Sequence, residues 1–448
     1  MFKGKRKEPN QQEPIYQSHV LSDRCYYFLR PILEELHSLL DRRLVNTFLQ
    51  LVLVLLMHRH RNQGLLLTEL GGHLLSPERA PSGTKRIANL IHSKKWQVKH
   101  IQDYLWQQSD QRLDELIGPD QDVYVIWDES VLEKPESLQL DGLCAVRSSK
   151  ARRLKRIKPG FYNPPGGRPI FVPGVNWLQI LITGLKSTPS LAHFRFWSTR
   201  GPGASDKRTE ERQVLAHLAQ RWGKGVIHVW DCGFAGSPWV KYALEQNVFF
   251  ILRWKKDYKL SGPKGGQKAW QILRGKRSWE HRLIYDCKRR CERRTGIVAT
   301  PVSLPDEPNA QLWLVVSRPG NGKTPWYLLT NLPVHSPQEA WGIIFGYNRR
   351  WQVEMSLRFD KSELAFECPR LMKRENREKL LGIAALAYAF LLSLVHPDSQ
   401  ITQNYLLRFW CHRTGKRSLR IQAPLYRLRL ALSQLWLSFR PPCLPRLI

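Results

Sequence analysis

At 448 residues the chain exceeds a single ordinary hydrophobic core, so we expect two or three domains. Its hydrophobic fraction of 42%, with 17 Trp, excludes a largely disordered chain. Seventy Lys and Arg against 38 Asp and Glu give a formal charge of +32, spread along the whole sequence, which predicts an extended surface for a polyanion such as nucleic acid. A membrane surface or a ribosome would attract the same bulk charge.

Cysteine spacing and the length of apolar runs argue against two further classes. The eight cysteines are scattered, as is typical of a reducing compartment, and the lone C-x3-C of Cys287 and Cys291 lacks the second ligand pair of a structural zinc site. The apolar runs 44–57 and 380–395 are shorter than the roughly 18 to 20 residues of a membrane span, so we expect buried core helices. No apolar signal core follows the basic N-terminus, and we expect a cytoplasmic protein.

The first half of the chain changes from helical to mixed spacing. Residues 1–24 are polar and predict a loose tail. Residues 25–118 have helical spacing and include a basic segment at 82–96, which predicts a helical DNA-binding domain. Between 119 and 255, buried strands such as "DVYVIWD" and "GVIHVWD" alternate with helices such as 207–222. This alternation predicts the first part of a mixed α/β catalytic domain.

The second half resumes that pattern after an interruption. Residues 256–325 are basic and punctuated by Gly and Pro, which predicts a β-rich insertion subdomain. Residues 326–372 begin with the strand "WYLLTN" and continue in one long helix from about Ser336 to Lys361. Residues 373–448 predict a helical C-terminal region. The fold class we expect is α/β, with a mixed sheet between helical regions.

Two of the predicted strands end on an acid, "VYVIWD" at Asp128 and "VIHVWD" at Asp231. A carboxylate at the end of a buried strand costs free energy unless it is solvated, paired or bound to a metal. A single such Asp is well explained as a cap for the backbone donors of the next loop. Its recurrence in a chain poor in acids favours a functional site.

A third carboxylate, Glu354, lies among cations in "YNRRWQVEMSLRFDK". On a helix, four side chains of this segment, the signature stripe, point within roughly 60° of one direction: Tyr347, Arg350, Glu354 and Lys361. Three carboxylates from separated segments suit two-metal phosphoryl chemistry, because Mg²⁺ prefers oxygen ligands. We therefore expect Asp128, Asp231 and Glu354 to be catalytic metal ligands for two Mg²⁺ ions, which Mn²⁺ could replace, beside cations that hold the DNA backbone.

The signature stripe matches the Y-x2-R-x3-E-x6-K signature of the DDE transposases of bacterial insertion sequences, and the chain resembles their insertion-sequence-four family. Asp128 and Asp231 fall where that family has its first two acids, and "DCGFAGSPW" resembles its second-acid block. The resemblance covers about residues 120–370. It implies an RNase H-like (retroviral-integrase-like) fold with a β-rich insertion before the third acid, in a bacterial protein that is associated with the nucleoid when bound to DNA.

The resemblance also implies a reaction. Such enzymes bind the terminal inverted repeats of their element, cleave the DNA ends, commonly through a hairpin, and join the 3′-hydroxyl to target DNA. They usually act as dimers that bridge two ends. The implied phosphate contacts are Tyr347, Arg350 and Lys361. Trp326 stands 21 residues before the tyrosine, where family members carry a tryptophan that stacks on a flipped base.

Two departures from the family and two alternatives remain. Cys232 stands where family members often carry a basic residue, and Glu129 lies beside Asp128, although strand alternation sends it to the opposite face. The alternatives are a metal-dependent nuclease without strand transfer and a catalytically inactive DNA-binding protein of the same fold. "GNGKT" at 320–324 lacks the first Gly of a P-loop, so we expect no nucleotide cofactor.

Overall fold

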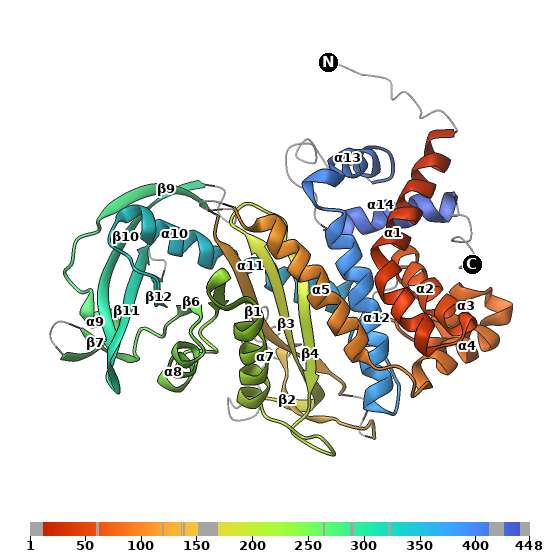
Figure 1. Cartoon of the computed structure of the whole chain (residues 1–448), viewed down its shortest axis with the longest axis horizontal. Coiled ribbons are helices and arrows are strands. Elements are labelled where there is room, and N and C mark those ends of the chain that lie inside the picture. Colours follow the sequence, from red (N-terminus) through yellow and green to blue (C-terminus); the bar gives the residue numbers. More distant parts are fainter. Residues whose placement is uncertain are drawn as a thin grey trace, which may run out of the picture.

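The computed structural model describes residues 12–439 except 60–61, 119–120, 136, 138, 151–168, 263–264, 287–290, 321–323 and 412–424. A mixed sheet lies between a helical region and a β-rich region at its two ends (Figure 1). The predicted tail up to residue 11, Cys287 and the centre of "GNGKT" fall outside the described residues.

Helices from both ends of the sequence pack together at one end of the molecule (Figure 1). Helix α2 contacts both α12 and α14, and α12 also contacts α5. Both apolar runs lie in these buried core helices, as expected. The helices of this region are α1 (Gln12–Leu39), α2 (Arg42–Met57), α3 (Leu67–Leu74), α4 (Ala80–His92), α5 (Val98–Leu116), α12 (Arg374–Ser393), α13 (Gln400–Phe409) and α14 (Leu425–Ser438), with short 3-10 turns at Pro77–Arg79 and Pro397–Ser399.

No single helix among the described residues is long and apolar enough to cross a membrane. Two consecutive segments, Arg374–Ser393 and Pro397–Phe409, are together long and apolar enough for a span, but the chain bends by 78° between them.

The prediction of a loose tail to residue 24 is wrong for its second half, because α1 begins at Gln12. Ser18 and Leu21 are buried there. The Ser18 hydroxyl donates to the Phe439 carbonyl at 2.7 Å, and the Trp436 indole donates to the Ser18 carbonyl at 3.3 Å. This polar segment is helical because it packs on α14, from the opposite end of the sequence.

Residues 119–255, predicted as the first part of the catalytic domain, have the strand order of the RNase H-like fold, which confirms the expected fold class. The order is β4-β3-β1-β5-β6; β3 runs antiparallel to β1 and β4, whereas β1, β5 and β6 are parallel. These elements are β1 (Val123–Glu133), β3 (Phe171–Gly184), β4 (Ser190–Trp197), β5 (Ile227–Trp230) and β6 (Phe249–Arg253), with the edge strand β2 (Cys144–Arg147), helices α7 (Lys207–Trp222) and α8 (Ser237–Glu245) and a 3-10 turn at Gly223–Gly225.

The residues between β6 and the Glu354 helix continue the same sheet. Strand β12 pairs antiparallel with β6 and with β11, so the β-rich region extends the sheet instead of standing apart from it. Its elements are β7 (Lys259–Gly262), β8 (Gly265–Lys268), α9 (Ala269–Ile272), β9 (Glu280–Asp286), β10 (Cys291–Leu304), β11 (Glu307–Arg318) and β12 (Trp326–Thr330).

Strand alternation gives the sheet two faces with separate hydrophobic cores. One face carries α10 (Pro337–Asn348) and α11 (Trp351–Ser362) and joins the core of the helical region. The other face is covered by α7, α8 and α9. On β12, Trp326 packs on the first core and Tyr327 on the second. Neighbouring residues of one strand therefore serve different faces.

Candidate active site

Three elements bring the three predicted acids to one region. Asp128 lies on β1, Asp231 follows β5 directly, and Glu354 is in the first turn of α11, which contacts β1. Ile126 of β1 pairs with Val229 of β5, and the same register extended by two residues sets Asp128 beside Asp231. The prediction that the first strand ends at Asp128 is wrong, because β1 continues to Glu133.

The acids act on one another electrostatically. Burial, together with the charges of Asp231 and Glu354, raises the pKa of Asp128 to about 7 against the opposing effect of Arg350. The Asp128 side chain is only 16% exposed. A carboxyl group in this position releases its proton reluctantly unless another cation arrives.

Arg350 is the cation in direct contact with two of the acids. Its Nη1 lies 3.6 Å from Oδ2 of Asp128, and its Nη2 donates to Oε1 of Glu354. Among the described residues, no three acidic, His or Cys side chains stand close enough to hold one metal ion. The acids fit a divalent cation by donor type, because carboxylate oxygens are the ligands that Mg²⁺ prefers, but in this structure Arg350 stands between Asp128 and Glu354.

The signature stripe does not lie on one helix. The prediction of one continuous helix from about Ser336 to Lys361 is wrong, because α10 ends at Asn348 and α11 begins at Trp351. Tyr347, Arg350 and Glu354 remain close across the break: Arg350 contacts Glu354 and affects the pKa of Tyr347.

Lys361 lies at the other end of α11. Burial lowers its pKa, and the acids that act on it most strongly are Glu367 and Glu133, ahead of Asp128. Of the three candidate acids, Asp128 is therefore the one shown to act on Lys361.

An aromatic pair borders the acids on the same face. The rings of Trp326 and Tyr347 meet edge to face with centroids 5.2 Å apart. Arg253, the last residue of β6, lies 5.5 Å from the Trp326 ring centroid and 6.0 Å from that of Tyr347. Sequence reasoning missed Arg253, the end of the strand parallel to β5, because the strand-end argument was applied to acids alone.

Sequence reasoning also missed the cations nearest the second acid. Cys232 is exposed, and the Gly233 amide donates to Oδ1 of Asp231 at 2.7 Å. Arg208 donates to the Gly233 carbonyl at 3.2 Å from the start of α7. Lys207 ion-pairs with Glu129, which points away from the acids as strand alternation predicts. These cations come from a different helix, so no motif around Asp231 reveals them.

A comparison with known proteins found a match to a family model. Residues 197–390 match the family model of the transposase DDE domain, a span that contains Asp231 and Glu354 and begins after Asp128. A search of curated proteins found no significant match.

Two solved structures are similar over large parts of the chain. The piggyBac transposase synaptic complex with hairpin DNA shares 13% identity, covering 99% of this chain and 85% of that one with a TM-score of 0.39. The NurA nuclease from Sulfolobus solfataricus shares 11% identity, covering 58% and 84% with a TM-score of 0.23. Both similarities are too weak to carry an argument about function. The family match is the comparison that bears on function: residues 197–390 are similar to the transposase DDE domain.

Proposed function

We propose that the protein is a DNA transposase of the insertion-sequence-four family. It binds the terminal inverted repeats of its insertion sequence, cleaves the DNA ends through a hairpin and joins the 3′-hydroxyl to target DNA. The observation that carries the proposal is the convergence of Asp128, Asp231 and Glu354 from β1, β5 and α11, in a chain whose residues 197–390 match the transposase DDE domain model. A formal charge of +32 supports DNA as the partner.

In this proposal the three acids hold two divalent metal ions, Mg²⁺ or Mn²⁺. Two such ions, when bound, activate the attacking oxygen of a phosphoryl transfer and stabilise the leaving one. Arg350, which contacts Asp128 and Glu354 in this structure, would bind a phosphate of the terminal nucleotides. A guanidinium suits either partner, because it binds carboxylate and phosphate with the same donor geometry.

The remaining residues of the proposal position DNA. Tyr347 and Lys361 contact the terminal phosphates, and Trp326 stacks on a flipped base during hairpin formation. The edge-to-face packing of Trp326 on Tyr347 supports the pairing of these roles, because it fixes the distance between a base site and a phosphate site. A homodimer bridges the two ends of the element.

One assay separates the proposal from its alternatives. The protein is incubated with Mg²⁺, DNA carrying the terminal inverted repeats of its element, and a target plasmid. Joined products support the transposase, cleavage without joining supports a metal-dependent nuclease, and retarded but intact DNA supports an inactive DNA-binding protein.

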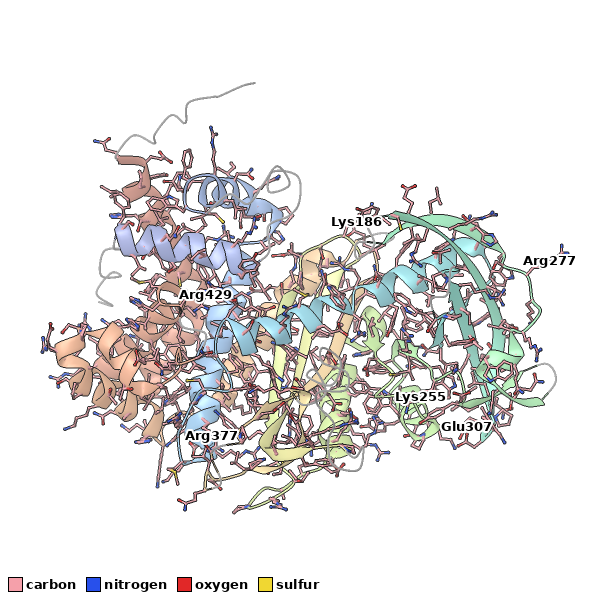
Figure 2. The ribbon with its side chains drawn as sticks, turned by 180° about the vertical axis from the view of Figure 1, so that it is seen from behind. Lys186, Lys255, Arg277, Glu307, Arg377 and Arg429 are labelled. Atoms are coloured by element: carbon pink, nitrogen blue, oxygen red, sulfur yellow. The ribbon has the colours of Figure 1, made fainter. Side chains whose placement is uncertain are left out.

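The variant that tests the ligand set is Glu354→Gln, which keeps the shape of the side chain and removes its charge. We expect no cleavage and unchanged end binding. The matched control is Glu307→Gln, at an exposed glutamate of the β-rich region that pairs with Lys241 (Figure 2). Normal cleavage by the Glu354 variant would remove this residue from the metal site.

A further inference from the structure

The β-rich region contains a cavity of about 330 Å³ on the sheet face opposite the candidate active site. Its wall includes Trp270 of α9, Arg274 and Lys276 of the following turn, Arg318 at the end of β11 and Tyr327 of β12. The volume is within the usual range of small-ligand sites, at its lower end. The function proposed above does not use this cavity.

The cavity wall is positively charged. Among the described residues that line it are three cations and no Asp or Glu. Arg318 donates to the carbonyls of Lys276 and Leu273 at 2.6 and 2.8 Å, and Lys276 donates to the Thr300 hydroxyl at 2.9 Å. These partners are neutral, so they fix the side chains without cancelling their charge. The wall is therefore suited to an anion.

Two aromatic rings accompany the cations. Trp270 and Tyr327 are partly exposed, and the Arg274 guanidinium lies 5.9 Å from the Trp270 ring centroid. Asp257 acts electrostatically on Tyr327 but does not line the cavity. Flat rings beside uncompensated cations are the two features that bind a nucleotide of a single strand, through base stacking and a phosphate contact.

The position of the cavity links it to the strand that carries Trp326. Tyr327 follows Trp326 on β12, and alternation directs one ring to each face of the sheet. Strand β12 thus holds one aromatic ring at the candidate active site and another in the basic cavity.

We propose that this cavity binds one nucleotide of a DNA strand, with the base against Trp270 and Tyr327 and the phosphate against Arg274 and Lys276. The proposal extends the proposed function, because it gives the same DNA a second contact on the opposite face of the sheet.

The test is photo-crosslinking of the full chain to a single-stranded oligonucleotide of arbitrary sequence that carries 5-iododeoxyuridine, in EDTA so that no cleavage occurs. Residue-level mapping of the crosslinks is expected to find Trp270, Arg274, Lys276 or Tyr327, which line the cavity. Crosslinks that fall only elsewhere, including at Trp326 on the opposite face of the sheet, would overturn the proposal.

Matched variants measure the contribution of each group. Trp270→Ala is expected to weaken binding of the same oligonucleotide about 5- to 150-fold, and Trp270→Phe to restore most of it. Trp279→Ala, at an exposed tryptophan outside the cavity, is the control. If Trp270→Ala and Trp279→Ala bind alike, with a folded Trp270 variant by circular dichroism, no base stacks on Trp270.

The phosphate contact has its own pair of variants. Arg274→Gln is expected to make the log–log dependence of affinity on salt shallower by about 0.7, the value for one phosphate of a single strand. Arg277→Gln removes the same charge from an exposed arginine at the outer end of the β-rich region and is expected to change the slope less (Figure 2). Equal slopes for both variants would contradict the contact at Arg274.

Two competitors test the ligand class. Inorganic phosphate at constant ionic strength is expected to leave the crosslink intact, and its full displacement would mean a simple anion site. An RNA of the same sequence that crosslinks in place of the DNA would overturn the assignment to DNA. Because these measurements need no metal and no inverted repeat, they can succeed where the transposition assay fails, and the reverse.

Discussion

Two carboxylates on one strand, Asp128 and Glu133 of β1, have opposite environments. Glu133 is 3% exposed, and burial acts to raise its pKa, but it accepts hydrogen bonds from Ser148, Ser149 and the Lys150 amide, which together hold its pKa below the usual range. Asp128 has its pKa raised to about 7 by burial and by two neighbouring acids.

The difference separates a carboxylate whose charge is satisfied within the protein from one in the environment expected of a metal ligand. The charge of Glu133 is satisfied within the protein, so nothing is gained by adding a cation. The charge of Asp128 is only partly compensated, by a guanidinium 3.6 Å away that also contacts Glu354. A site whose acids repel one another is stabilised by an incoming cation, and perturbed pKa values of this kind are concentrated at functional sites.

The largest effects, one on activity and one on stability, are expected from replacing the two compared carboxylates themselves. Asp128→Asn should lower the cleavage rate more than about 100-fold, because even partners of metal ligands contribute 10- to 100-fold. It should not lower the unfolding free energy, since it removes a repelled charge. Glu133→Gln should do the reverse and cost about 1.5–3 kcal/mol of stability through weaker hydrogen bonds to a neutral group.

The two readouts are the cleavage rate per folded molecule and chemical denaturation in EDTA. Equal loss of stability in both variants would mean that Asp128 is as well satisfied as Glu133. Loss of cleavage in a stably folded Glu133 variant would place that residue in the catalytic site instead.

The pH dependence of stability sharpens the same comparison in metal-free protein. Because folding raises the pKa of Asp128 to about 7, its charged form destabilises the fold, and this cost grows as pH rises from its ordinary value of 3.8 towards 7. Asp128→Asn should therefore melt increasingly above the wild type from about pH 4 to pH 7, and by a constant margin at higher pH.

The contribution of Glu133 to the pH dependence of stability has the opposite sign. Its pKa is lowered, so its stabilising effect is fully present above the ordinary value of 4.5 and is lost as pH falls through the folded-state pKa. The deficit of Glu133→Gln should be constant near neutral pH and shrink below about pH 4.5. A melting series in EDTA measures both trends, and parallel curves for the two variants would contradict the assignment of opposite environments.

The sequence predicted the elements that hold Asp128 and Asp231 well, because buried β-branched and aromatic runs mark β1 and β5. It missed the helix break before Trp351, because no Gly or Pro stands at the break itself, residues 349–350. It also missed Arg253, whose position beside Trp326 follows from the pairing of β6 with β12. Contacts between distant segments carry no local pattern.

Trp326→Ala tests the aromatic border of the acid site and should have an intermediate effect. Loss of one stacked base costs about 1–3 kcal/mol, so hairpin yield should fall about 5- to 150-fold while initial nicking continues. Trp326→Phe keeps a ring beside Tyr347 and should retain most of the yield. Gel quantification of hairpin and nicked products measures the effect, and an unchanged yield in the alanine variant would remove the stacking role.

Substitution of Lys361 should give the smallest effect, because both Asp128 and Glu133 act on this lysine. The acids that act on it most strongly are Glu367 and Glu133, yet it also lies within electrostatic reach of Asp128. If it contacts one phosphate of duplex DNA, Lys361→Gln should make the salt dependence of end binding shallower by about 0.9 in log–log slope.

The matched control for this change is Lys241→Gln, at a lysine of α8 that pairs with Asp306 and Glu307 away from the acids. That variant should leave the slope unchanged. If Lys361→Gln also leaves the slope unchanged but lowers the melting temperature, the Lys361 charge stabilises the protein through Glu133 and Glu367 and binds no phosphate. The phosphate-binding part of the signature stripe then ends at Arg350.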